Sequence, residues 1–439
     1  MTTAATDVGA ISDKVHRQQL RRAVIASAVG TTIEWYDFFV YSIVTGLVFA
    51  RLYFPQSDPL AGTLQAYAVF FVGFMSRPIG ALIFGHYGDR IGRKSALIAT
   101  LLLTGLATFA VGLVPTYAQI GIWGAMLLIV FRFIQGVGVG GEWSGSVLLS
   151  MEWAKTNAHR GFLASCPQLG SPLGLAVANL AVLAFSRLSG DQFLSWGWRI
   201  PFLLSIVMVG IGAYIRLGIS ETPVFARVIA EERVERAPSI EVWKRHPKQI
   251  ILSALARMGE QAPTYIYLAY VFTYGTTVVG ASRDFLLIAL LGSAVLGLLW
   301  VPIAGHLSDR IGRKRMYIIA AAISGLFGFI YFALLDTRSP ILIVAAILLS
   351  FPVSCNLYGP QAALIAESFS PRLRYSGAGL GYQLASIIAG GPAPFIAAAL
   401  FAAFHSGYAI ALYILGCGVV SVVATSLLPD HTNKDISEG

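Results

Sequence analysis

The residues best suited to chemistry are charged side chains that lie inside long apolar segments. They comprise three arginines and four carboxyls, namely Arg77, Arg132, Arg257, Glu34, Asp37, Glu142 and Glu260. A charge within hydrocarbon costs several kcal/mol unless it faces a partner or an aqueous cavity. We predict that the arginines bind an anionic group and that one or more desolvated carboxyls take and release a proton. Internal ion pairing, for instance of Arg132 with Asp37 or Glu34, is the alternative.

Helical spacing places several of these side chains on common faces. An α-helix turns about 100° per residue, so side chains three, seven or ten residues apart fall within about 80° of arc. The groups aligned in this way are Glu34, Asp37 and Tyr41 in the first segment, Arg132, Gln135 and Glu142 in the fourth, and Arg257, Glu260 and Tyr267 in the seventh. The predicted proton-coupling set is Asp37, Glu34, Arg132 and Glu142.

Hydrogen-bonding side chains beside helix-breaking residues extend the predicted cavity. Gln168 follows Pro167, and Tyr358 and Gln361 flank a Gly-Pro pair. Such breaks accompany transport sites in helical transporters, although each one alone favours ordinary helix packing. The full set of predicted substrate-binding residues is Arg77, Arg132, Tyr41, Gln135, Gln168, Arg257, Glu260, Tyr265, Tyr267, Tyr358, Gln361, Tyr382 and Gln383.

The composition shows which elements must carry these residues. The chain has 439 residues, of which 56% are hydrophobic and only 12% are charged, whereas soluble domains contain about 25% charged residues. A water-soluble or disordered protein is therefore excluded. Apolar runs long enough to cross a bilayer occur at residues 23–50, 65–87, 95–115, 121–149, 161–186, 198–218, 250–279, 284–306, 316–335, 340–367, 375–403 and 407–428.

These runs predict an all-α membrane protein with twelve transmembrane helices in two six-helix bundles. The bundles cover residues 23–218 and 250–428, and a polar linker with an amphipathic helix covers residues 219–249. Residues 1–22 and 429–439 form the tails. Most of the 31 Lys and Arg residues lie in the tails, the linker and alternate connections. The positive-inside rule assigns those segments to the cytoplasm, so we predict that both tails are cytoplasmic.

A sequence repeat relates the two halves. GHYGDRIGRK at residues 85–94 recurs as GHLSDRIGRK at residues 305–314. Its glycines permit a tight turn, and its aspartate could accept hydrogen bonds from a helix N-terminus or pair with an arginine of an adjacent helix. A merely basic anchor is the alternative. With a looser echo between the halves, the predicted gating set is Gly85, Asp89, Arg90, Gly92, Arg93, Gly305, Asp309, Arg310, Gly312, Arg313, Glu152, Arg160, Glu367 and Arg374.

Other classes of function lack support in the sequence. No nucleophile elbow, nucleotide-binding loop or metal-ligand spacing occurs, so we predict neither an enzyme nor a bound cofactor or metal. The basic residues lie between apolar runs rather than on one solvated face, which argues against nucleic acid. The glycines at residues 136–141 lie within an apolar run and indicate close helix packing. Energy for any transport must come from an ion gradient or from the substrate's own gradient.

Four segments together resemble the metabolite:proton symporter family of the major facilitator superfamily. They are IEWYDFF at residues 33–39, RFIQGVGVGGEW at 132–143, WGWRIPF at 196–202 and RYSGAGLGYQ at 374–383. The resemblance runs from about residue 20 to residue 428 and is nearest to the shikimate permease branch. The long coiled-coil extension of the family's osmolyte transporter has no counterpart after Pro429, which argues against osmosensing.

The resemblance implies proton-coupled uptake of a small, usually carboxylated metabolite by alternating access across the bacterial inner membrane. It also implies an acidic pair at Glu34 and Asp37, a coupling residue at Arg132, and gating acids at Asp89 and Asp309. The expected partners are an anionic small molecule, protons and the lipid bilayer, and the protein is expected to function as a monomer. Uptake of a zwitterionic osmolyte, efflux of a drug or metabolite, and a transporter-like sensor are the alternatives.

Overall fold

The computed structural model describes residues 13–151, 159–218, 238–432 and 434, and helices joined by short turns make up these ranges without any strand. Ten helical segments among them are long and apolar enough to cross a membrane. The first helix and the broken helix over residues 247–279 complete twelve crossings. The prediction of an all-α membrane fold with twelve helices is confirmed.

The N-terminal bundle builds several of its crossings from consecutive shorter helices. With η marking a 3₁₀ or π-helical turn, its elements are α1 (Asp13–Val44), η1 (Thr45–Phe49), α2 (Ala50–Tyr53), α3 (Pro59–Arg90), α4 (Arg93–Leu113), α5 (Tyr117–Ile120), α6 (Trp123–Met151), α7 (Arg160–Ser165), η3 (Cys166–Leu169), α8 (Gly170–Ser189), η4 (Gly190–Gln192), η5 (Phe193–Gly197), α9 (Arg199–Leu203) and α10 (Ser205–Leu217).

The C-terminal bundle repeats this construction. Residues 219–237 of the predicted linker lie outside the described residues, and the remainder contains α12 and the start of α13. The elements of this half are α12 (Pro238–Arg245), α13 (Pro247–Ala256), α14 (Met258–Tyr265), η6 (Ile266–Tyr270), α15 (Val271–Tyr274), η7 (Gly275–Val279), α16 (Arg283–Ile311), α17 (Arg313–Asp336), α18 (Pro340–Ala366), α19 (Arg374–Ala385), η8 (Ser386–Gly390), α20 (Ala393–Phe404) and α21 (Gly407–Leu427).

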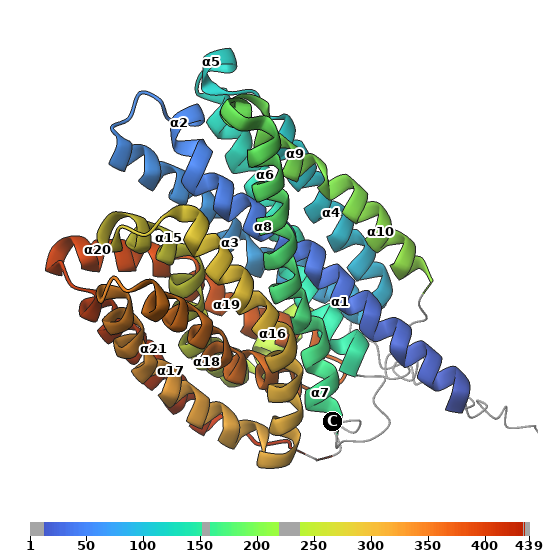
Figure 1. The fold of residues 1–439 in the computed structure, drawn as a ribbon. Helices are drawn as coiled ribbons and strands as arrows, with labels where there is room; N and C mark the ends of the chain where they lie inside the picture. The colour runs from blue at the N-terminus through green and yellow to red at the C-terminus, as the bar shows by residue number, and fades with distance from the viewer. Residues whose placement is uncertain (1–12, 152–158, 219–237, 433, 435–439) are drawn as a thin grey trace, which may run out of the picture.

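The two bundles lie side by side, as Figure 1 shows by the blue-to-green helices of one half and the yellow-to-red helices of the other. The start of α1 and the C-terminus lie toward the same face, which we call the termini face, whereas α2 and α5 lie on the opposite side. Across the interface, α19 packs against α3 and α6, and α16 packs against α7 and α8. Any site between the bundles is therefore framed by these helices.

The seventh crossing is broken where its sequence combines a charge with a proline. Helix α13 ends at Ala256 and α14 begins at Met258, so Arg257 occupies the junction. Pro263 lies inside α14 and is followed by the π-helical turn η6, because proline lacks an N–H and clashes with the preceding turn. Irregular backbone is tolerated at membrane depth where protein covers it or where it lines a cavity. Arg257 and Glu260 are thus held at a local break.

Glycines let the helices of the N-terminal bundle approach one another closely. Gly140 of α6 lies against the backbone of Arg77 in α3, and Gly136 lies against Gly73 and Ser76. Small residues at helix crossings improve van der Waals packing, which drives helix association inside a membrane. The prediction that the glycines at residues 136–141 serve close helix packing is confirmed.

Gly140→Ala should lower the thermal stability of the protein, because a Cβ at this position would overlap the carbonyl group of Arg77. Overpacking of this kind costs about 1–3 kcal/mol. Thermal unfolding of the purified protein measures the change. Gly416→Ala in α21 is the matched control, since a Cβ there meets nothing within 4 Å. Equal unfolding temperatures for the two variants would contradict the packing role.

Candidate functional site

A cavity lies between the two bundles. Trp35 and Pro172 of the N-terminal bundle face Glu260, Phe351 and Tyr358 of the C-terminal bundle across it. Glu260 is the one charged group among its described lining residues. An apolar wall with a few polar groups is typical of small-molecule sites. The other polar side chains in the lining are Ser171, Thr264, Tyr267, Ser350, Ser354 and Cys355.

A second, smaller and tightly packed pocket brings together two buried arginines. Arg132 donates a hydrogen bond to Gln135, and its guanidinium carbon lies 4.4 Å from the ring centroid of Tyr41. The guanidinium carbon of Arg77 lies 4.5 Å from the ring centroid of Phe74. Within the described ranges, the buried ion pairs involve other arginines. Neither Arg77 nor Arg132 is among them, and their binding of an anion stays a prediction.

The acidic pair of α1 lies close to these arginines. Asp37 is fully buried, and its polar neighbours are Thr108 and Arg132. Among the described residues, neither carboxylate oxygen of Asp37 has a hydrogen-bond donor of standard geometry. Glu34 lies one helical turn nearer the termini face, where the charges of Glu142 and Arg77 act on it. A buried carboxylate without donors is costly to keep charged.

Glu142, by contrast, has a full set of partners. Arg216 of α10 donates to Glu142 Oε2 at 3.1 Å and also binds Oε1, while Thr100 donates to Oε2 at 2.7 Å. The sequence did not single out Arg216, because a basic residue at the end of an apolar run is usually an interfacial anchor. Among the described residues, internal ion pairing thus occurs at Glu142 and between Arg257 and Glu260, and not between Arg132 and the acids of α1. A part for Glu142 in proton coupling stays a prediction.

Arg257 contacts three other predicted site residues at the helix break. Its Nε atom lies 3.5 Å from Glu260 Oε2 and 3.3 Å from Gln361 Oε1. Its Nη1 atom donates to the carbonyl oxygen of Tyr382 at 2.7 Å. The Tyr382 ring in turn stacks on Trp143 of the other bundle, with ring centroids 3.6 Å apart. The sequence did not indicate a role for Trp143.

The remaining predicted binding residues connect the two bundles. The ring centroids of Tyr265 and Phe38 lie 5.5 Å apart across the interface. Gln168 Nε2 donates to the carbonyl oxygen of Tyr358 at 2.8 Å, and Gln383 Nε2 lies 3.5 Å from two carbonyl oxygens of α6. Neither glutamine lines the larger cavity. Their direct contact with a substrate stays a prediction.

At the termini face, Asp89 of α3 binds the first turn of α19. The backbone N–H of Ser376 donates to Asp89 Oδ2 at 3.0 Å, and the Ser376 hydroxyl donates to the same oxygen at 2.8 Å. Arg93 Nη1 lies 3.2 Å from Asp89 Oδ1. Both contacts suggested by the repeated motif therefore occur here. Gly85 allows this approach, because a Cβ there would meet Ser376.

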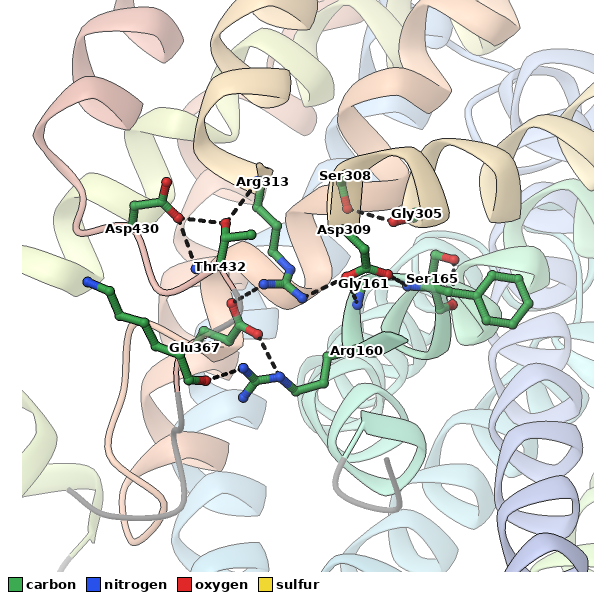
Figure 2. A network of polar contacts seen from close by, with 12 residues as sticks. Arg160, Gly161, Ser165, Gly305, Ser308, Asp309, Arg313, Glu367, Asp430 and Thr432 are labelled. Atoms are coloured by element: carbon green, nitrogen blue, oxygen red, sulfur yellow. Dashed lines mark hydrogen bonds and ion pairs between the residues drawn. The ribbon is translucent and has the colours of Figure 1, made fainter. Parts of the chain in front are cut away.

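Asp309, the equivalent aspartate of the second repeat, makes the same kinds of contact (Figure 2). The backbone N–H groups of Gly161 and Phe162, in the first turn of α7, donate to its carboxylate at 2.9 and 3.0 Å. Arg313 Nη2 lies 2.8 Å from Asp309 Oδ1. A helix N-terminus attracts a carboxylate through its free N–H groups and its dipole. Each bundle thus presents an aspartate to a helix of the other.

Glu367 ties the two sides of this network together (Figure 2). Its carboxylate lies 3.0 Å from Arg313 Nη1 and 3.3 Å from Arg160 Nε. Burial raises the pKa of Glu367 to about 7, although the cations of Arg313 and Arg160 oppose the shift. The predicted counterpart Glu152 lies outside the described residues. Arg374 is buried at the start of α19, where its Nε donates to the carbonyl oxygen of Phe369 at 3.2 Å.

The other members of the predicted gating set shape the two turns. Gly92 and Gly312 have φ angles of 111° and 99°, a conformation that favours glycine. Gly305 lies so close to α7 that a Cβ would overlap Ser165. Arg90 and Arg310 are exposed, as expected for basic residues at the edge of a membrane.

Comparison with known proteins identifies the family of this chain. Residues 23–249 match the family described as "Sugar (and other) transporter", and residues 144–371 match "MFS/sugar transport protein". The inner membrane metabolite transport protein YhjE of Escherichia coli K12 is 39% identical over 425 residues, which covers 94% of this chain and 95% of that protein. The chain belongs to the major facilitator superfamily. As the motifs predicted, it falls within the metabolite:proton symporter family.

Further relatives agree with this assignment. The shikimate transporter of E. coli K12 is 41% identical over 416 residues, which cover 93% of this chain and 94% of that protein. The solved structure of the proton:xylose symporter XylE has the same fold, with a TM-score of 0.77 at 18% identity over 96% of this chain and 98% of that one. This major facilitator protein is therefore a multi-pass transporter of the bacterial inner membrane and not an enzyme.

Thermal unfolding should reveal a pH-dependent contribution from Glu367 to the stability of this transporter. The pKa of Glu367 is about 7 in the folded protein, against a model-peptide value of 4.5. The folded state therefore binds the proton more tightly, and this contribution decreases as the pH rises from about 4.5 to about 7. The full difference corresponds to about 3 kcal/mol.

Glu367→Gln should remove this part of the slope of Tm against pH between about pH 5 and pH 8. Loss of the ion pairs with Arg160 and Arg313 also shifts Tm as a whole. The readout is therefore the slope of Tm against pH and not Tm itself. Glu241→Gln makes the same chemical change at an ion pair with Arg245 on α12 and controls for net charge. Equal slopes for wild type and Glu367→Gln would rule out a titrating Glu367.

Proposed function

We propose that this transporter couples proton movement to the uptake of a small organic anion, with shikimate as the first candidate substrate. The observation that carries the proposal is the burial of Arg77 and Arg132 in one pocket, with Arg132 beside Asp37, a carboxyl without a hydrogen-bond donor of standard geometry among the described residues. Buried guanidinium groups require an anionic partner. A buried carboxyl without donors is suited to carry a proton. The likeness to the E. coli shikimate transporter supports this choice of substrate.

In this proposal, each of the two pockets binds a different part of the substrate. Arg77 and Arg132 hold the carboxylate of the substrate, because a guanidinium offers paired donors to a carboxylate. The cavity at Glu260 accommodates the rest of the molecule, and its hydroxyl-bearing side chains bond to substrate hydroxyls. Trp35 lines one cavity and Phe38 lines the other, with their ring centroids 5.5 Å apart. The two pockets are therefore neighbours, and side-chain movement on binding would let one molecule reach both.

Alternating access then requires the termini face to open and close. We place this face in the cytoplasm, because most Lys and Arg residues lie in the tails and the connections next to them. The contacts of Asp89 and Asp309 hold it closed, and inward release must break both. Each chain contains both bundles and both aspartates, so the transporter needs no second copy and functions as a monomer.

Uptake into proteoliposomes tests the proposal. An inward proton gradient should drive accumulation of radiolabelled shikimate, and a protonophore should abolish it, because the proton gradient is the energy source supplied to these vesicles. Accumulation that is unaffected by collapse of the gradient would contradict proton coupling. If shikimate is not transported, competition among unlabelled mono-, di- and tricarboxylates for binding, measured by thermal shift, would identify or exclude another organic anion.

Asp37→Asn should abolish proton-driven accumulation while retaining exchange of labelled for unlabelled substrate. The amide keeps the shape of the side chain but cannot carry a proton, whereas exchange requires no net proton movement. The measurement compares counterflow with gradient-driven uptake in the same proteoliposomes. Asp191→Asn, on the exposed turn η4, is the matched control. Normal accumulation by the Asp37 variant would remove this residue from the coupling role.

A zwitterion is the second candidate substrate, because Glu260 is the one charged residue among the described residues lining the larger cavity. The carboxylate of Glu260 would face a quaternary amine while an arginine holds the acid group. A glycine betaine/proline/ectoine/pipecolic acid transporter of Dickeya dadantii is 30% identical over 444 residues, 99% of this chain and 87% of that protein. Thermal stabilisation by glycine betaine but not by shikimate would favour this candidate.

A further inference from the structure

We propose that Trp143 and Tyr382 form an aromatic gate on the termini side of the larger cavity, and that Arg257 holds this gate closed until substrate binds. The proposal rests on the proposed function in one respect, namely that the substrate occupies the cavity beside Glu260. Neither the repeated motif nor the charged residues indicated this role for Trp143. It follows from contacts that join the two bundles on the termini side of the cavity.

Among the described residues, these two rings form the shortest aromatic contact between the bundles. Trp143 lies on α6 and Tyr382 on α19, with ring centroids 3.6 Å apart and ring planes inclined by 17°. Each side chain is about 3% exposed. Stacked rings attract each other beyond the effect of burial. Because the rings belong to different bundles, any rotation that opens this side must separate them.

The position of the stack along α19 places it between the cavity and the termini face. Ser376, which binds Asp89, is six residues before Tyr382, or about 9 Å of helix rise. Between them, the hydroxyl of Tyr375 donates to the carbonyl oxygen of Gly141 at 2.7 Å. Beside the cavity, Tyr265 contacts Phe38. The stack is therefore the inner closure nearest the cavity.

Arg257 supports Tyr382 from its free side. The guanidinium carbon lies 3.1 Å from the centroid of the Tyr382 ring, and Nη1 donates to the Tyr382 carbonyl at 2.7 Å. Since Trp143 covers one ring face, the cation covers the other, which is a favourable cation–π arrangement. The same guanidinium lies 3.5 Å from Glu260, which lines the cavity. One side chain thus touches both the gate and the cavity wall.

Trp143 is connected to the cavity by a second route. Its indole N–H donates to Gln168 Oε1 at 2.9 Å, and Gln168 Nε2 donates to the carbonyl oxygen of Tyr358 at 2.8 Å. Tyr358, like Glu260, lines the cavity. A substrate whose hydroxyl groups draw Arg257 toward the cavity would remove the cation from Tyr382 and weaken the stack. The gate would then open toward the termini face when the site is filled.

Native Cys355 provides a reporter that needs no substrate. It lines the cavity and is 2% exposed. Cys166→Ser and Cys417→Ser remove the other two cysteines and define the background protein. A membrane-impermeant maleimide is then added to inverted membrane vesicles, where the proposed orientation exposes the termini face, and to right-side-out vesicles. The rate of Cys355 labelling measures how often the cavity opens to each side.

Trp143→Ala should increase the labelling rate about tenfold in inverted vesicles and leave it unchanged in right-side-out vesicles. Trp143→Phe should restore slow labelling, because a phenyl ring can still stack on Tyr382. Trp123→Ala is the matched control, since it makes the same change on α6 at a residue that is 68% exposed. Slow labelling of a folded Trp143→Ala protein, or an equal increase in both vesicle types, would overturn the proposal.

Arg257→Ala should also increase labelling in inverted vesicles, and it should add little when combined with Trp143→Ala, because both changes act on one contact. Additive effects of the two substitutions would show that Arg257 does not hold the stack. These measurements use empty protein, so their result does not depend on the identity of the substrate or on proton coupling. Failure of shikimate uptake and failure of the gate are therefore separate outcomes.

Discussion

The structure depends above all on a carboxylate of one bundle binding the first turn of a helix in the other. Asp89 binds the start of α19, and Asp309 binds the start of α7. Each aspartate also pairs with the arginine four residues later in its own motif. Since that arginine begins the next helix, the turn and both flanking helices are held to the opposite bundle. Opening the termini face requires two such contacts to break.

The buried charges farther from the termini face fall into two groups. A rotation of the bundles would leave the surroundings of the first group unchanged and alter those of the second. Glu142 and Arg216 belong to the same bundle, so their ion pair moves as one body and can persist through a transport cycle. Arg257 and Asp37 also have their polar partners within their own bundles, but aromatic side chains next to them contact the opposite bundle, as the Tyr382–Trp143 and Phe38–Tyr265 contacts show. Their surroundings change when the interface opens. Substrate binding and proton exchange need side chains of this second kind.

Sequence patterns predicted the structural features that depend on a single segment or on a repeat. The twelve crossings follow from apolar length, and the contacts of Asp89 and Asp309 follow from the duplicated motif with its glycine turns. Arg216 was missed because its position at the end of an apolar run does not distinguish a buried partner from a surface anchor. Trp143 was missed because an aromatic residue in an apolar run resembles ordinary core. Helical periodicity gives the face of a residue, but not its partner across the interface.

The contacts between the bundles differ in physical character along the interface. Beside the larger cavity, Tyr265 meets Phe38 and Phe74 through apolar ring contacts. On the termini side, the aromatic stack is backed by ion pairs of Asp309, Arg313 and Glu367. Burial of ions costs hydration that largely offsets their mutual attraction, so water entering an open face would recover much of the energy lost with the ion pairs. The network can therefore fix the geometry of the closed face without making it too stable to open in each cycle.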